Sequence, residues 1–163
     1  MLQIDSVETL YKAGIAKLKS AEQQGLQAYD TMIGKAKSPE LKQALQQHRG
    51  ETELHVQRLE QIQQRSGDGS MEVQDEIVPT IIRENEKMQS MIANDELGDV
   101  SLIVGAQIGE HYEIAAYGSV MAHAKLLGRD EDVELLKQTL QEEKKTDELL
   151  SRLAETSVNK KAA

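Results

Sequence analysis

The strongest constraint in this 163-residue sequence is an apolar pattern with the spacing of α-helices, repeated over four long segments. Apolar residues recur in alternating steps of three and four, which places them along one face of a helix. The expected helices span about residues 5–34, 38–65, 99–128 and 130–155. Their start signals are Asp5 or Ser6, Ser38–Pro39, Asp99 and Asp130. Four amphipathic helices of this length predict a helical bundle.

A long connection separates the second expected helix from the third. Residues 66–70 are rich in glycine and serine and predict a loop, and residues 94–98 form another break. Residues 71–93 carry a weaker helical pattern that contains Pro79. Ferritin-like bundles have one such long crossover, whereas simple up-down bundles have only short loops. We therefore predict one domain over residues 1–163, an all-α, ferritin-like four-helix bundle with a short extra helix in the crossover.

Composition excludes several classes of function. The net charge is −9 and there is no dense stripe of Lys and Arg, so nucleic-acid binding is not expected. No apolar run approaches the roughly 20 residues that span a bilayer, so we expect no membrane segment. The absence of Cys excludes thiolate metal sites and cysteine nucleophiles. The first residues lack the features of a signal peptide, which makes the cytoplasm the expected location.

Acidic or imidazole side chains interrupt the apolar face near the middle of each helix. On these faces or their flanks lie Glu22, Glu51, His55, Glu110, Glu113, Glu143 and Asp147. An ionised carboxylate costs several kcal/mol to bury, and grouped carboxylates repel one another or take up protons. No Lys or Arg faces inward at these levels, so divalent cations would have to supply the counter-charge. Oxygen ligands with one or two imidazoles suit iron or manganese, and we predict two iron ions, with manganese as the alternative.

The two halves of the chain repeat the same spacings. Seven residues separate Glu22 from Tyr29 in the first half and Glu110 from Tyr117 in the second half. Four residues separate Glu51 from His55 in the first half and Glu143 from Asp147 in the second half. Residues four apart share one face of a helix. The repetition therefore predicts two helical hairpins, related by a pseudo-twofold axis, that each supply half of a metal site.

These spacings suggest a role for each acidic residue. In this interpretation Glu22 and Glu110 bind one metal each, whereas Glu51 and Glu143 bridge the two metals. Glu113 lies one turn after Glu110 and is a candidate ligand on the open side of the site.

For the other polar and aromatic residues on these apolar faces, more than one role is possible. His55 and Asp147 are either direct ligands or outer partners of a ligand. His48 is more simply a partly buried residue of the stripe. Tyr29 and Tyr117 are core aromatics by default, and the alternative is that they hydrogen-bond a ligand or take part in one-electron chemistry.

Four segments carry a resemblance to a known family: residues 21–24, 51–60, 110–118 and 142–147. They resemble the YciE/YciF family of bacterial stress-associated ferritin-like proteins, over nearly the whole chain, and the third segment is the most specific. The resemblance implies a di-iron-type centre, induction under general stress and a homodimer. The sequence departs from the usual ferritin and rubrerythrin pattern in one respect. In those proteins the Glu and the His are usually three residues apart, whereas Glu51 and His55 are four residues apart. Asp147 also replaces the second His.

Three functions fit these features. The first is a di-iron or di-manganese protein that reacts with O2 or peroxide. The second is a metal-stabilised structural or binding protein without turnover. Iron storage in a cage is the weakest, because only residues 157–163 follow the fourth helix and leave no fifth helix for cage assembly.

Overall fold

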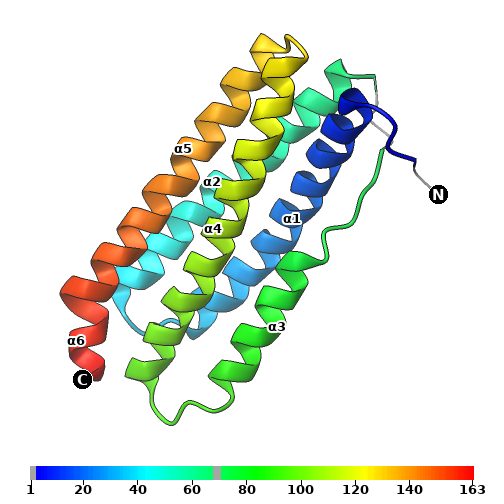
Figure 1. The fold of residues 1–163 in the computed structure, drawn as a ribbon. Helices are drawn as coiled ribbons and strands as arrows, with labels where there is room; N and C mark the ends of the chain where they lie inside the picture. The colour runs from blue at the N-terminus through cyan, green and yellow to red at the C-terminus, as the bar shows by residue number, and fades with distance from the viewer. Residues whose placement is uncertain (1–2, 68–70) are drawn as a thin grey trace.

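The computed structural model describes residues 3–67 and 71–163, which form helices and connections without any strand. The long helices are α1 (Val7–Lys35), α2 (Pro39–Arg65), α4 (Asp95–Leu126) and α5 (Asp130–Leu153), and the crossover carries the shorter α3 (Ile77–Gln89). A π-helical turn, η1 (Ala154–Val158), and the short α6 (Asn159–Ala162) follow α5. The predicted all-α four-helix bundle with an extra crossover helix is confirmed (Figure 1).

The bundle consists of two helical hairpins. α1 packs along α2 and α4 along α5, and the hairpins meet through contacts of α1 with α4 and of α2 with α5. Helix α3 lies outside the bundle against α4 and α1. In Figure 1 the crossover returns along the bundle, so α4 begins at the end opposite to the end of α2. One long connection of this kind is the connection pattern of ferritin-like bundles. None of the described helices is long and apolar enough to cross a membrane.

The start of α4 corrects one predicted boundary. The helix begins at Asp95 rather than near Asp99, because the side chain of Asn94 accepts a hydrogen bond from the backbone N–H of Leu97. The Asp99 carboxylate instead accepts hydrogen bonds from the backbone N–H groups of Lys37, at 2.9 Å, and Ser38, at 2.7 Å. Asp99 therefore ties the turn between α1 and α2 to α4.

Two glycines follow the ends of long helices. Gly67 follows α2 with φ 72° and Gly128 follows α4 with φ 66°, and both values lie in the left-handed region that favours glycine. Residues 68–70 of the predicted loop lie outside the described residues. Helix α5 ends at Leu153, close to the predicted end near residue 155, and the chain continues through η1 and α6, with Val158 buried in the core.

The core is aliphatic and divided into two clusters. One contains Tyr11, Ile15, Leu18, Leu59, Ile62, Tyr117, Val120, Ala124, Val133, Leu136 and Leu140. The other contains Tyr29, Met32, Ala36, Leu41, Leu45, Leu102, Ile103, Ala106, Leu150 and Val158. On each long helix the residues between the two sets are polar and buried. The apolar clusters therefore enclose a polar layer halfway along the bundle.

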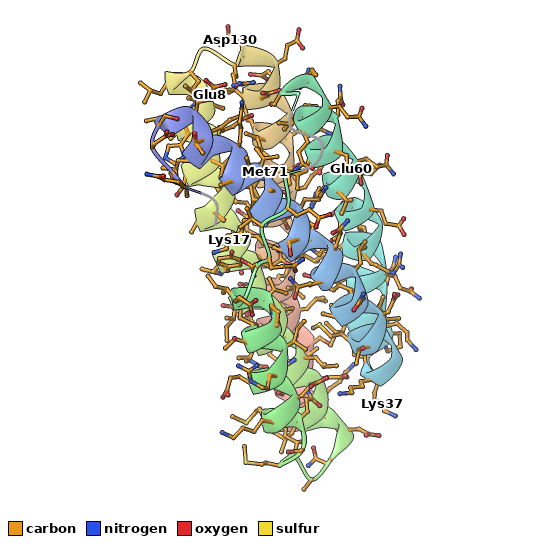
Figure 2. All side chains as sticks on the ribbon, turned by 90° about the vertical axis from the view of Figure 1, so that its right-hand side faces the viewer. Glu8, Lys17, Lys37, Glu60, Met71 and Asp130 are labelled. Carbon is orange, nitrogen blue, oxygen red and sulfur yellow. The ribbon has the colours of Figure 1, made fainter. Side chains whose placement is uncertain are left out.

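A buried aspartate fastens the crossover to the bundle. The Oδ1 of Asp75 accepts hydrogen bonds from the N–H groups of Ile77 and Val78, which caps α3. Its own N–H donates to Ser20 of α1, and the hydroxyl of Tyr112 on α4 donates to its other oxygen. Figure 2 shows the chain descending from Met71 in front of the bundle to α3. These contacts fix where α3 begins.

Candidate metal centre

Side chains from all four long helices meet in the polar layer. They are Glu22 of α1, His48, Thr52 and His55 of α2, Glu110 and Glu113 of α4, and Glu143 and Thr146 of α5. None of them is more than 7% exposed. Five of the seven predicted ligands are therefore buried together in the layer, together with His48.

One group in this layer consists of Glu22, His55 and Glu143. Each offers one ligand atom, and the three atoms lie within 4.8 Å of one another. The Nδ1 of His55 is 3.4 Å from Glu22 Oε1 and 2.9 Å from Glu143 Oε1. The spacing suits three donors around one cation.

A second group consists of His48, Glu110 and Glu143, again with ligand atoms within 4.8 Å of one another. The Nε2 of His48 is 3.1 Å from Glu110 Oε1 and 3.5 Å from Glu143 Oε2. Glu143 belongs to both groups and places one oxygen near each histidine. Two neighbouring three-residue groups with a shared carboxylate are the arrangement that two bridged ions require.

Several atoms of these groups have no hydrogen-bond partner among the described residues. They are Nδ1 of His55, Oε2 of Glu110 and both oxygens of Glu143, all of them buried. His55 Nδ1 and Glu143 Oε1 are close to each other but lack hydrogen-bond geometry. Buried polar atoms are rarely left unpaired, because each one costs about 1–3 kcal/mol, and more if charged. The donor set therefore fits divalent cations of the iron or manganese type.

The carboxylates of the layer shift one another's pKa. Burial raises the pKa of Glu143 well above its usual value, and the charges of Glu22 and Glu110 raise it further. Burial also raises the pKa of Glu113, with Glu22 and Glu143 as the next causes. For Glu110, burial is again the largest cause and acts in the same direction, but the charge and hydrogen bond of His48, together with the neighbouring Glu143 and Tyr29 side chains, outweigh it and the pKa is lowered.

The histidines respond in the opposite direction. Burial lowers the pKa of His48, but the charge of Glu110 and its hydrogen bond outweigh burial and raise the pKa well above its usual value. Burial likewise lowers the pKa of His55, and the hydrogen bond and charge of Glu22 more than compensate. Without cations, the layer therefore holds protons in their place. Metal ions that bind here would displace those protons.

Outer partners orient both imidazole rings. The Nε2 of His55 lies 2.9 Å from Glu142 Oε2, and Arg58 holds the same carboxylate through Nη1, at 2.5 Å, and Nη2, at 3.1 Å. The Nδ1 of His48 lies 2.9 Å from Thr146 Oγ1. These contacts leave Nδ1 of His55 and Nε2 of His48 facing the carboxylates, as in histidines that bind metals.

Two tyrosines connect the hairpins across the layer. Tyr29 of α1 donates a hydrogen bond of 2.6 Å to Glu110 of α4, and Tyr117 of α4 donates one of 2.5 Å to Glu22 of α1. The hypothesis that these tyrosines hydrogen-bond candidate ligands is confirmed. Burial raises the pKa of both phenols well above the usual value, so both keep their protons.

Two predicted ligands lie at the edge of the layer. The side chain of Glu51 is 28% exposed, and its Oε2 is 3.5 Å from Nδ1 of His48, which makes it an outer partner of that ring. The side chain of Asp147 is 20% exposed, accepts a hydrogen bond of 3.1 Å from Gln107 and lies 3.4 Å from Nδ1 of His111. Neither belongs to the two groups. A direct ligand role for Glu51 or Asp147 stays a prediction that these contacts do not support.

Sequence reasoning missed two members of the site. From the sequence, His48 is interpreted only as a partly buried residue of the apolar face. It lies seven residues before His55 on the same helical face, and this spacing could have indicated a second histidine in the site. Glu142 lies on the flank of α5 beside Glu143, and its contact with His55 depends on how α2 and α5 pack. Nothing in its own neighbourhood in the sequence indicates that contact.

Comparisons with known proteins identify the family of this chain. Residues 6–163 match the model of the family DUF892, which is described as a domain of unknown function. The chain belongs to the DUF892 family. The curated Protein YciF of Escherichia coli K12 is 32% identical over 162 residues, which are 99% of this chain and 98% of that protein.

Solved structures of other bacterial proteins share the fold. The crystal structure of the E. coli stress protein YciF has a TM-score of 0.90 and 31% identity, with 96% of this chain and 99% of that chain covered. YcfI from Rhodopseudomonas palustris, described as a candidate structural protein, has a TM-score of 0.88 and 34% identity over 91% of this chain and 95% of that chain. A protein from Xanthomonas campestris, at 19% identity and a TM-score of 0.73 over 92% of each chain, shows the fold alone.

Proposed function

We propose that this DUF892 protein binds two iron ions, or alternatively two manganese ions, in the polar layer and reacts with O2 or peroxide during bacterial stress. The observation that carries the proposal is Glu143, which is fully buried, shared between two ligand groups and without a hydrogen bond on either oxygen. A carboxylate in this position is satisfied when each oxygen contacts a cation.

The residues of the layer have distinct roles in this proposal. Glu22 and His55 would hold one ion, Glu110 and His48 would hold the other, and Glu143 would be available to both. A bound pair of these metals supplies two electrons to a small oxygen species.

The side chains around the two groups set the orientation of the ligands. The hydroxyls of Tyr29 and Tyr117 fix one oxygen of Glu110 and of Glu22. Glu113, which is also buried in the layer, offers a further carboxylate on the side of α3.

The similarity to a stress protein of E. coli supports the stress role. We also propose a cytoplasmic location and a homodimer, and light scattering of the purified protein tests the oligomeric state. A particle of cage size in that measurement would favour iron storage instead.

A second function has support of its own. The R. palustris relative is described as a candidate structural protein, which favours a metal-stabilised structural or binding protein without turnover. In that case the ions act by stabilising the native state to which they bind.

One experiment separates these functions. Protein is reconstituted with iron(II) or manganese(II), the bound ions are counted by elemental analysis, and consumption of hydrogen peroxide is followed. Two ions with consumption above that of a Glu22→Ala/Glu110→Ala variant support the oxidoreductase. Two ions without consumption support the structural role. Less than one ion per chain refutes the metal centre.

A further inference from the structure

A cavity of about 370 Å³ lies between α1, α3 and α4, outside the polar layer. Its size falls in the range of pockets that hold small organic molecules. Figure 2 shows α3 in front of the bundle, where it covers this side. The cavity therefore exists because the crossover helix packs over two helices of the bundle.

The inner wall of the cavity is apolar. Met32 of α1, Val78 of α3, and Leu102 and Ala106 of α4 line it and are buried. The charged lining residues Lys35, Arg83 and Glu86 are exposed, so they mark the mouth. A molecule that enters would leave water for an apolar wall, which is favourable by about 25 cal/mol per Å² of apolar surface.

Glycines keep the cavity open. A Cβ atom added at Gly109 would meet no atom within 4 Å, and one added at Gly25 would meet only the ring of Tyr29, at 4.0 Å. Both glycines line the cavity, from α4 and from α1 respectively. A Cβ atom at either position therefore fits, and a larger side chain there would extend into the space of the cavity.

The cavity ends at the polar layer. Glu113 lines its inner end, is 6% exposed and accepts no hydrogen bond from the described residues. The ring of Tyr29 lines the same end, while its hydroxyl is already bonded to Glu110. The free Glu113 carboxyl is therefore the polar group that a molecule in the cavity would meet.

We propose that this cavity binds a neutral aliphatic molecule of about ten non-hydrogen atoms, with its chain along the apolar wall and a hydroxyl-type polar end at Glu113. At about 30 Å³ for a water-sized group, the volume holds on the order of ten such groups. A carboxylate end is disfavoured, because an ionised group would lose its hydration at the buried inner end, where Glu113 is the polar group it would meet. The cavity is present without metal, so the inference goes beyond the proposed metal chemistry and does not depend on it.

The test is direct binding of 1-octanol to the metal-free protein, followed by the NMR signal of the Met32 methyl group. Saturable binding with a shift of that signal is expected. Sodium octanoate, which has the same chain length and a charged end, should bind at least tenfold more weakly. Equal or tighter binding of octanoate would overturn the placement of the polar end, and no shift with octanol would overturn the site.

Matched variants locate the binding. Gly109→Leu should weaken octanol binding at least tenfold, whereas Gly118→Leu should change it less than twofold. Gly118 is on the same helix, lies outside the cavity lining, and a Cβ there also meets no atom within 4 Å. If Gly109→Leu does not fold, Gly25→Leu tests the opposite wall with the same expected loss. Octanol binding that these substitutions in the wall leave unchanged would refute the proposal. Octanol binding should persist in the Glu22→Ala/Glu110→Ala variant. Loss of the metal centre and loss of the cavity site can therefore be told apart.

Discussion

Replacing Glu143 by Gln should change stability in opposite directions with and without metal. In the metal-free protein the pKa of Glu143 is raised, first by burial and then by neighbouring carboxylates. A raised pKa in the native state costs stability once the pH exceeds the unfolded value, and a neutral Gln removes that cost. The metal-free variant should therefore melt at a higher temperature than the wild type at pH 8.

With metal the same substitution should be harmful. An ion at a free concentration of 100 times its Kd raises the free energy of unfolding by about 2.7 kcal/mol. Two such ions therefore raise it by about 5 kcal/mol. For a chain of this size that corresponds to a rise of about 10–20 °C in Tm. Glu143 belongs to both ligand groups, so Glu143→Gln should reduce the rise to less than about 5 °C.

Calorimetric melts with chelator and with saturating manganese(II) measure both effects. Glu148→Gln, an exposed site on the same helix, is the control and should behave as wild type. A wild type whose Tm does not respond to metal, or a Glu143→Gln variant with the full metal response, would refute the reasoning.

Three further substitutions or conditions test other parts of the structure. Tyr117→Phe removes the buried hydrogen bond to Glu22 and should lower the free energy of unfolding by about 1–3 kcal/mol in urea melts; no loss would contradict that bond. Burial and neighbouring carboxylates raise the pKa of Glu113 well above its usual value of 4.5. Metal-free protein should therefore lose stability as the pH rises above that usual value, and Glu113→Gln should lose less; a parallel decline would oppose this assignment. Asp99→Ala should lower the free energy of unfolding by about 0.5–2 kcal/mol, because two backbone N–H groups just before α2 lose their acceptor. In the same urea melts, Asp95→Ala at an exposed site should lower it by less.

The sequence predicts the bundle well because helical periodicity is a local property. Ser38–Pro39 and Gly128 mark boundaries that the structure confirms, since caps depend on neighbouring residues. The prediction that α4 starts near Asp99 is wrong, because an Asp that suits a helix start can also serve elsewhere. The Asp99 carboxylate accepts hydrogen bonds from backbone N–H groups about 60 residues earlier in the chain. Contacts of that range leave no local signal.

The polar layer was predictable in part for the same reason. Glu22, Glu110 and Glu143 were found from their position on apolar faces, and the structure buries all three. Glu51 and Asp147 lie on the flanks of their helices, where a small rotation decides between the centre and the edge. That rotation is set by packing between helices, which periodicity along one helix does not specify.

The tyrosine contacts across the hairpins bear on when this protein would acquire the metal ions that we propose. Residues 1–67 contain Glu22, His48 and His55, but the phenol that holds Glu22 and the shared Glu143 are translated later. A nascent first hairpin thus presents an incomplete set of donors to cellular iron. We expect loading only after α5 has left the ribosome and docked, so that the ions enter a chain that has already folded.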